Sequence, residues 1–295
     1  MKTEEINIRD PYILCSNRKY YLYGTRSATT WGLAEGFDCY ESSDLENWEG
    51  PFEIFHRQED FLLDRAYWAP ECYEIDGKYY LITTLGSENK KKAVYALVSD
   101  SPKGPFLMHS DGALTPEGWC CIDGSLHFEG DGRLYLIFSH SFEDVPTGDM
   151  VAVELSRDLK RAVSGPRVLF NAVTAPWAKP VPFAKAEFNM DGDVYFTDGP
   201  CAYRLKDKTL MIVWSSWTEQ GYGVGMAVSG DGTIGGEWRH QEEKLYPGNG
   251  GHGMIFCTYE GDLKYLMHYP NDIYQERPCF FDLVEEQGRL KLVRG

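Results

Sequence analysis

Four carboxylates and one imidazole occupy similar settings along this chain, and groups of these types can donate and accept protons. They are Asp10, Glu71, Asp123, Asp198 and His252. Each lies at or near the start of a short run of strand-forming residues, which a polar turn separates from a second, apolar run. A single carboxylate in such a place is an ordinary turn residue, but five polar residues in one recurring setting indicate a common site.

The segments around these residues are five copies of one hairpin pattern. The copies begin at Arg9, Ala69, Ile122, Tyr195 and Gly251. Their turns contain residues favoured in hairpins, such as Asp76-Gly77 and Asp131-Gly132, and further strands follow each hairpin. Four strands in each of five units of roughly 50 residues predict an all-β fold, a five-bladed β-propeller with four antiparallel strands per blade. We expect residues 1–295 to form a single domain of this kind.

Propeller geometry would bring the five polar residues together, because the first strand of each blade lines the central channel. We therefore expect them at one mouth of that channel. The loops between second and third strands, and the connections between blades, reach the same mouth. They carry Trp31, Trp68, His140 and Trp217. Carboxylates at the floor and aromatic rings at the rim predict a sugar-binding site, because sugar faces stack on rings while charged groups bind hydroxyls.

Composition argues against several classes of partner. The net charge of −16 argues against nucleic acid and anionic membranes, because both need clustered Lys and Arg. No stretch approaches the ~20 apolar residues of a membrane span, and the first residues do not resemble a signal peptide. The eight cysteines form no CxxC pair, so we expect reduced thiols and a cytoplasmic location.

The motifs resemble glycoside hydrolase family 43. The resemblance depends on RDPYI at residues 9–13, WAPE at 68–71, IDGS at 122–125, DGP at 198–200 and GGHGMIF at 250–256. The outer-strand segments SSDLENW and SDSPKGPF also match, and the ordered set covers essentially the whole chain. The resemblance implies an enzyme that hydrolyses α-L-arabinofuranosyl or β-D-xylosyl linkages with inversion at the anomeric carbon.

Carried over motif by motif, the resemblance implies a role for each of four residues. Asp10 is then the general base that deprotonates a water, Asp198 is the general acid, and Asp123 tunes the pKa of the acid and orients it. His252 resembles the histidine that faces a hydrated metal ion, often calcium, in the channel; no cofactor is required for the chemistry itself. Inversion needs two carboxyl groups roughly 6.5–9.5 Å apart. A third carboxylate beside the acid keeps it protonated by like-charge repulsion.

One motif departs from the family, which usually has Glu-Gly-Pro where this chain has Asp198-Gly199-Pro200. Three explanations stay open. The backbone at Asp198 lies closer to the substrate, or Glu187 in the preceding connection acts as the acid, or the acid is missing and the propeller binds sugar without hydrolysis. We favour the first, because the other motifs are intact.

We therefore expect release of L-arabinofuranose from arabinan or arabinoxylan oligosaccharides of plant origin. A β-xylosidase of the same family is the nearest alternative, and a non-catalytic carbohydrate-binding propeller is the alternative from another class. A phosphorylase would need cations beside the acid, and Lys179, Lys185 and Arg204 form no convincing cluster. Trp68 is the expected sugar platform, and Glu71 is expected to contact a hydroxyl or to be structural. For His252, a satisfied buried histidine is the alternative to a metal neighbour. The sequence does not predict an oligomeric state.

Overall fold

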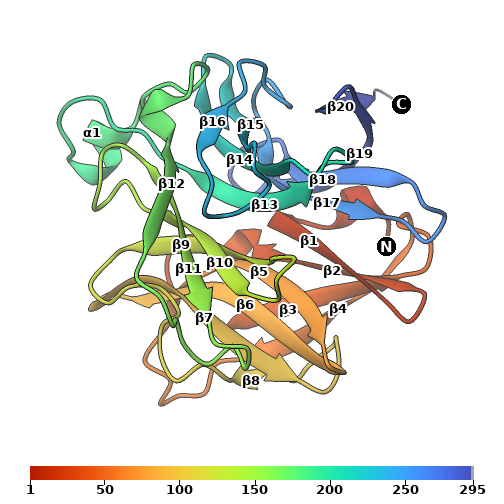
Figure 1. Ribbon diagram of the computed structural model, residues 1–295. Coiled ribbons are helices and arrows are strands. Elements are labelled where there is room, and N and C mark those ends of the chain that lie inside the picture. Colours follow the sequence, from red (N-terminus) through yellow and green to blue (C-terminus); the bar gives the residue numbers. More distant parts are fainter. Residues whose placement is uncertain (294–295) are drawn as a thin grey trace.

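Twenty strands form five four-stranded antiparallel sheets within residues 1–293, the part of the chain that this computed structural model describes. The sheets are arranged around a central axis as the blades of a propeller (Figure 1). Each sheet contains four consecutive strands, in chain order from the axis outward. The predicted five-bladed β-propeller is therefore confirmed.

Blade 1 contains β1 (Ile8–Ser16), β2 (Lys19–Arg26), β3 (Gly36–Ser42) and β4 (Trp48–His56). Blade 2 contains β5 (Arg65–Ile75), β6 (Lys78–Ser87), β7 (Lys90–Ser99) and β8 (Leu107–Met108). Blade 3 contains β9 (Cys121–Phe128), β10 (Leu134–His140), β11 (Asp149–Leu155) and β12 (Arg167–Asn171). Blade 4 contains β13 (Asp198–Arg204), β14 (Leu210–Thr218), β15 (Gly221–Ser229) and β16 (Trp238–His240). Blade 5 contains β17 (Gly251–Cys257), β18 (Leu263–Tyr269), β19 (Arg277–Glu286) and β20 (Arg289–Val293). The short helices are η1 (Thr3–Glu5), η2 (Ser27–Thr29), η3 (Ala172–Thr174) and α1 (Ala184–Phe188).

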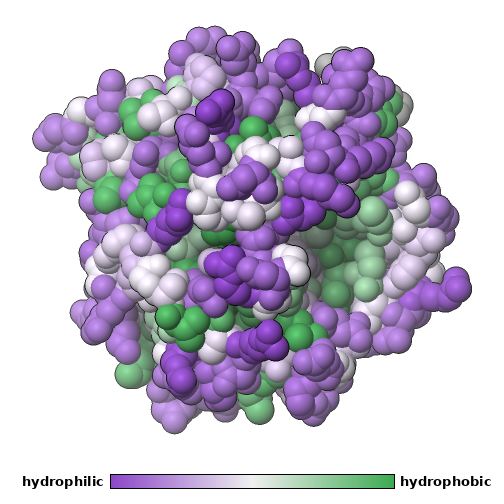
Figure 2. Space-filling view, viewed as in Figure 1, coloured by the Kyte–Doolittle hydropathy of each residue, from purple (hydrophilic) through white to green (hydrophobic). Residues whose placement is uncertain are grey.

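The second strand of each blade is buried on both faces, because neighbouring blades pack against it. Leu22, Leu81, Leu136, Ile212 and Leu266 on these strands are completely buried. Runs of β-branched, aliphatic and aromatic residues suit such two-sided burial. The apolar clusters between blades make the ring a rigid support for the channel mouth. The outer face is mainly hydrophilic, and apolar side chains are visible where the surface is hollowed (Figure 2).

The two ends of the propeller meet through side chains, because no sheet combines N-terminal and C-terminal strands. Blade 1 lies beside blade 5 in Figure 1. Asn7 Nδ2 donates to the Glu276 carbonyl at 2.8 Å, and Arg277 Nε donates to the Glu4 carbonyl at 2.9 Å. A buried ion pair between Arg9 and Glu276, also at 2.8 Å, completes the closure. Within the described residues, no helix is both long and apolar enough to cross a membrane.

A β-bulge interrupts the first strand of every blade at the same register. One residue at each bulge has a positive φ: Asp10 (51°), Ala69 (47°), Asp123 (60°), Gly199 (48°) and His252 (44°). Bulges redirect side chains, and left-handed backbone at non-glycine residues concentrates at functional sites. The position equivalent to Asp10 is thus Gly199 in blade 4 and Ala69 in blade 2. Asp198 lies one residue before its bulge and Glu71 lies two after, so the equivalence expected from the sequence is wrong in these two blades.

A ring of hydrogen bonds connects these bulges. In four of the five links, a side chain near the end of a second strand accepts the bulge N–H of the next blade. The pairs are Thr25 Oγ1 with Ala69 at 2.8 Å, Thr84 Oγ1 with Asp123 at 2.9 Å, Ser215 Oγ with His252 at 2.8 Å, and His268 Nδ1 with Asp10 at 3.3 Å. In these four links, the first strand of a blade is thereby held by the blade before it.

The link from blade 3 to blade 4 is different. Ser139 has the same register on β10 as Thr84 on β6, but its buried hydroxyl has no hydrogen-bond partner among the described residues. The N–H of Gly199 donates instead to Asp123 Oδ2 at 3.2 Å. In this one link, the Asp123 carboxylate therefore takes the place of the second-strand acceptor, next to the point where Asp198 enters the channel.

Candidate active site

The channel mouth brings Asp10, Asp123, Asp198 and His252 into one cluster. His252 Nδ1 lies 2.9 Å from Asp198 Oδ1, 3.3 Å from Asp10 Oδ1 and 3.7 Å from Asp123 Oδ2. The bulges of β1, β9 and β17 aim three of these side chains at the axis, and Asp198 joins them from the residue before the β13 bulge. The three carboxylates thus surround a single imidazole.

The three carboxylates differ in their access to solvent. The exposed fraction of the side chain is 5% for Asp123, 10% for Asp10 and 20% for Asp198. Asp123 therefore lies behind the other two. Asp198 and Asp10 are the two carboxyl groups that a ligand at the mouth can touch.

Asp123 and Asp198 share one proton, and their pKa values move in opposite directions. Burial, followed by the negative charge of Asp198, raises the pKa of Asp123 well above its usual value. Burial would also raise the pKa of Asp198, but hydrogen bonds from Asp123 and His252 outweigh it and lower that pKa. The proton therefore resides on Asp123, and Asp198 is ionised.

His252 is positively charged in this cluster. Burial alone would lower its pKa, but the neighbouring Asp10 and Asp123 carboxyl groups and the hydrogen bond to Asp198 raise the pKa to about 10. The imidazolium therefore offsets the charge of the ionised Asp198.

Asp10 is held by groups from its own blade and from blade 5. Thr25 Oγ1 donates to Asp10 Oδ2 at 2.6 Å. His268 Nδ1 accepts the backbone N–H of Asp10, and Nε2 on the other side of that ring lies 3.0 Å from Asn271 Oδ1. Burial, followed by the nearby Arg9, lowers the pKa of His268 to about 4, so this ring is neutral with its proton on Nε2. Asp10 is thus held in place by a neutral His268 ring and not by a charged one.

A buried ion pair lies behind these groups. Arg9 donates through Nη1 to Glu276 Oε1 at 2.8 Å and through Nη2 to Asn271 Oδ1 at 3.0 Å. Ser27 Oγ donates to Glu276 Oε2 at 2.7 Å. The contact that closes the propeller ring therefore also orients Asn271 and, through it, His268.

Trp31, in the loop between β2 and β3, and Trp68, on β5, form an aromatic corner. The two rings meet edge to face with centroids 5.3 Å apart, and Trp68 Nε1 donates to the Thr30 carbonyl at 2.7 Å. The corner lines a cavity of about 230 Å³, where the Lys92 ammonium lies 5.0 Å from the Trp68 ring centre. Trp68 directly precedes Ala69, whose N–H donates to Thr25 Oγ1, and the same hydroxyl donates to Asp10 Oδ2.

This arrangement of carboxylates and aromatic rings in a five-bladed propeller agrees with a sequence comparison. The profile of glycosyl hydrolases family 43 matches residues 5–283. The chain belongs to glycosyl hydrolases family 43. The resemblance seen in the sequence motifs is thereby confirmed, as is the assignment to the glycoside hydrolases.

Three proteins similar to this family 43 chain are named for different activities. The solved structure of an endo-arabinase from Bacteroides thetaiotaomicron is 34% identical with a TM-score of 0.88, and the match covers 98% of each chain. A beta-xylosidase of Xylanibacter ruminicola is 27% identical over 148 residues, 50% of this chain and 41% of that protein. A xylosidase/arabinosidase 43A of Humicola insolens is 27% identical over 141 residues, 44% of this chain and 42% of that protein. The matches thus span about two fifths of the length of these two curated relatives.

Glu71 lies deeper in the channel of this family 43 protein than the acid cluster. It is buried, and the Tyr73 hydroxyl donates to its Oε2 and also lies 3.3 Å from Ser125 Oγ. Burial raises the pKa of Glu71 to about 7, and the hydrogen bonds from Tyr73 and Ser125 limit that rise. Tyr12 packs 5.5 Å from the Tyr73 ring. This group of side chains fills the channel below the mouth.

Two of the expected rim residues are engaged elsewhere. His140 is buried against Trp119, with ring centroids 4.0 Å apart, and its Nε2 lies 3.2 Å from Asp144 Oδ2. Trp217 packs edge to face against Phe183 at 5.5 Å. His140 therefore faces away from the cluster, and Trp217 borders the connection that carries α1.

Glu187, considered above as an alternative acid, is an exposed residue of α1. This helix lies at the edge of the molecule in Figure 1. Asp198 is therefore the carboxyl group that blade 4 places in the cluster.

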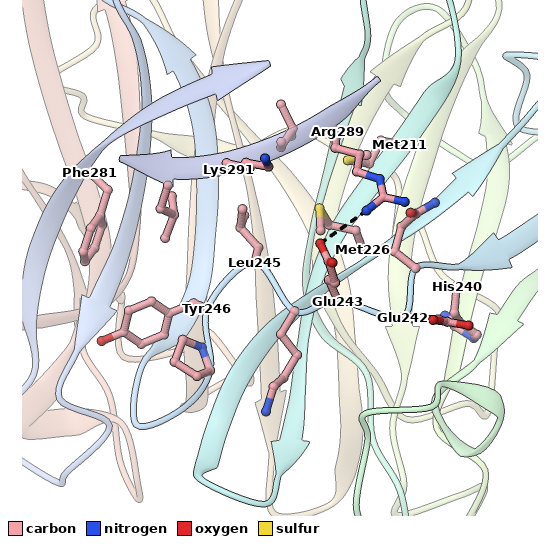
Figure 3. A pocket seen from close by; sticks show the side chains of 15 residues that line it. Met211, Met226, His240, Glu242, Glu243, Leu245, Tyr246, Phe281, Arg289 and Lys291 are labelled. Atoms are coloured by element: carbon pink, nitrogen blue, oxygen red, sulfur yellow. Dashed lines mark hydrogen bonds and ion pairs between the residues drawn. The ribbon is translucent and has the colours of Figure 1, made fainter. Parts of the chain in front are cut away.

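A larger cavity, of about 630 Å³, lies on the seam between blades 4 and 5 (Figure 3). Tyr246 and Phe281 stand at one end, and Arg289 pairs with Glu243 across the other at 3.4 Å. Met211 and Met226 form part of its wall. None of the clustered carboxylates lines this cavity.

Sequence reasoning missed three residues around the cluster: Tyr222, Asn271 and Glu276. Tyr222 is flanked by Gly221 and Gly223, and such glycines were the one local signal of a closely approached position. Asn271 and Glu276 lie in the connection between β18 and β19, where the repeat pattern offers no guide.

Proposed function

We propose that this family 43 enzyme releases L-arabinofuranose from arabinan or arabinoxylan oligosaccharides with inversion at the anomeric carbon. The main supporting observation is that Asp10 and Asp198, the two accessible carboxylates, both contact His252 at the channel mouth. Support for arabinose comes from the endo-arabinase, which is similar over nearly its whole length.

In this proposal Asp10 is the general base. Its Oδ2 accepts the Thr25 hydroxyl at 2.6 Å, which fixes the carboxylate and leaves Oδ1 to accept a proton from water. Inversion requires this water to attack the face of the sugar opposite the leaving group. Trp68 offers a ring on which the sugar stacks.

Asp198 is the general acid, and it receives its proton from Asp123. Because His252 and Asp123 lower the pKa of Asp198, the acid is ionised before substrate binds. When Asp198 turns from His252 towards the glycosidic oxygen, it loses that stabilisation. The proton on Asp123 then passes to Asp198 and from there to the leaving oxygen, while Asp123 becomes the carboxylate beside His252.

Such a movement would also widen the gap between the two carboxyl groups. Asp10 and Asp198 both lie near the same nitrogen, at 3.3 and 2.9 Å, so their nearest oxygens are closer together than the sum of those distances. Inverting enzymes hold the two carboxyl groups roughly 6.5–9.5 Å apart to admit a water. Substrate therefore enters as Asp198 swings outward, in keeping with its larger exposed fraction.

The test is hydrolysis of 4-nitrophenyl α-L-arabinofuranoside and 4-nitrophenyl β-D-xyloside by wild type, Asp10→Asn and Asp198→Asn. We expect wild type to cleave the arabinofuranoside and Asp10→Asn to lose about 10²- to 10⁴-fold in kcat, with a smaller loss for Asp198→Asn because 4-nitrophenolate leaves with little protonation. Cleavage of the xyloside alone would make the protein a β-xylosidase. Sugar binding without cleavage of either glycoside would make it a non-catalytic binding propeller.

We also propose that the channel accepts a calcium ion as a structural group. Asp123 and Asp198 offer the carboxylate oxygens that calcium prefers, and His252 would face the ion through a water after losing its proton. Such an ion would neutralise carboxylate charge at the mouth, as the His252 proton does. Calcium should then raise Tm in a thermal shift assay after chelator treatment, and magnesium at the same concentration should not.

A further inference from the structure

Tyr222 approaches the acid cluster from an unexpected direction. It lies on β15, the third strand of blade 4, rather than on a strand that lines the channel. Its ring is parallel to Phe196 at 6.1 Å on one side and to His268 at 5.6 Å on the other. The ring therefore fills the seam between blades 4 and 5, with Phe196 two residues before Asp198.

Gly251 makes this approach possible. A Cβ atom at Gly251 would lie 2.6 Å from Tyr222 Cε1, closer than side chains tolerate. The residue after Gly251 is His252, whose N–H is held by Ser215, the β14 partner of Asp198. Because Gly251 has no side chain, Tyr222 can approach the place where Asp198 of blade 4 and His252 of blade 5 meet.

The hydroxyl of Tyr222 is buried and has no hydrogen-bond partner of good geometry among the described residues. A buried donor left unpaired is unfavourable, so its retention calls for a partner in another state of the site. Asp198 is that partner by position. Ser215, the β14 partner of Asp198, has its Oγ 2.8 Å from the place that a Cβ on Gly251 would take, and Tyr222 Cε1 lies 2.6 Å from the same place.

We propose that Tyr222 is a positioning residue for Asp198, whose hydroxyl donates to this carboxyl group when it leaves His252 and aims it at the glycosidic oxygen. The inference depends on the acid role proposed for Asp198. Tyr222 does not transfer a proton. Its hydroxyl replaces the His252 contact on one oxygen, so that the other oxygen carries the proton received from Asp123.

The variant Tyr222→Phe tests this role because it keeps the ring between Phe196 and His268 and removes only the hydroxyl. Tyr265→Phe is a matched control. Tyr265 is also a fully buried tyrosine whose hydroxyl has no partner among the described residues, but it belongs to the apolar cluster between blades 4 and 5. Removing either hydroxyl should leave Tm unchanged or raise it slightly.

The decisive measurement is the dependence of kcat on the leaving group. Phenyl α-L-arabinofuranoside needs more protonation of its leaving oxygen than the 4-nitrophenyl glycoside does. For Tyr222→Phe we expect kcat to fall about 10- to 100-fold on the phenyl glycoside, several-fold at most on the 4-nitrophenyl glycoside, and KM to stay within about twofold. Tyr265→Phe should match wild type on both.

Two results would overturn the inference while the proposed function stands. One is an unchanged kcat for Tyr222→Phe on the phenyl glycoside. The other is an equal loss on both glycosides, which would assign Tyr222 to sugar binding instead of acid positioning. Failure of wild type to cleave either arabinofuranoside would count against the proposed function itself.

Discussion

His252 Nδ1 lies 2.9 Å from Asp198 Oδ1, and this contact couples the charge of the histidine to the protonation of the acid. Asp198 is ionised because hydrogen bonds from Asp123 and His252 lower its pKa, and His252 is charged because the surrounding carboxyl groups raise its pKa. In the proposed mechanism, this contact stabilises the resting site but not the reacting one, because Asp198 must be protonated and turned outward when the glycosidic bond breaks. Substrate binding therefore has to displace it.

The variant His252→Gln should be destabilised by about 3–5 kcal/mol at pH 6.5, because buried carboxylates lose their countercharge. The pKa of His252 is raised to about 10 from its usual value of 6.5. Its contribution to the free energy of unfolding is therefore fully present below pH 6.5 and is lost as pH rises through 10. The advantage of wild type over the variant should therefore shrink between pH 6.5 and 10. Urea unfolding at several pH values measures this.

His127→Gln is the control for this experiment. His127 is also buried, but burial lowers its pKa, so it stays neutral across the same pH range. Its substitution should produce a difference from wild type that does not vary between pH 6.5 and 10. A pH-independent difference for His252→Gln as well would contradict the charged state assigned to His252.

Glu71 should also make the stability of the protein depend on pH, because burial raises the pKa of this residue. Its pKa is about 7 in the folded protein against the usual 4.5, so its proton is bound more tightly in the folded state. Its contribution to the free energy of unfolding is present below pH 4.5 and is lost as pH rises through 7. The difference is about 3 kcal/mol.

The variant Glu71→Gln should remove this part of the pH dependence, because an amide oxygen still accepts the Tyr73 hydroxyl and carries no charge. Thermal unfolding at pH 5 and pH 8.5 should show a smaller loss of Tm for the variant than for wild type. The same loss in both proteins would show that Glu71 is ionised at neither pH or at both.

The repeat pattern of the sequence predicts the propeller and the meeting of Asp10, Asp123 and His252, because these three residues occupy the same bulge position. It misplaces Asp198 by one residue, since a bulge adds a residue without changing the apolar pattern on either side. Gly199-Pro200 is the true counterpart of Asp10-Pro11.

Other features depend on contacts that are far apart in the chain. Tyr222 reaches the site only because Gly251, on another blade, has no side chain. His140 lies at the expected edge of its blade, but Trp119 covers it. Sequence position indicates which edge a residue occupies, and packing between blades decides whether it faces the channel.

The broken link in the ring of bulge contacts predicts opposite effects for two equivalent residues. Thr84→Val removes the acceptor of the Asp123 N–H and should lower stability by about 1–3 kcal/mol, because this buried donor is left unpaired. Ser139→Ala removes a buried hydroxyl that has no partner among the described residues, so it should leave the free energy of unfolding unchanged or raise it. Urea unfolding compares the two variants, and an equal loss for both would show that Ser139 also holds β13.

The ion pair that closes the propeller supports a double-mutant cycle. Arg9→Met leaves the carboxylate of Glu276 buried without its cation and should lower the free energy of unfolding by about 3–5 kcal/mol. Glu276→Met has the same effect from the other side. The double variant should recover much of the loss, because apolar residues of similar volume often replace a buried pair at little cost.

Activity should not recover with stability in that cycle. Arg9 also holds Asn271, which orients the His268 ring behind Asp10, and methionine cannot replace this contact. We therefore expect the double variant to unfold at nearly the wild-type urea concentration and still to show a reduced kcat on the 4-nitrophenyl arabinofuranoside. Full recovery of kcat would show that ring closure alone, without the Asn271 contact, positions the base.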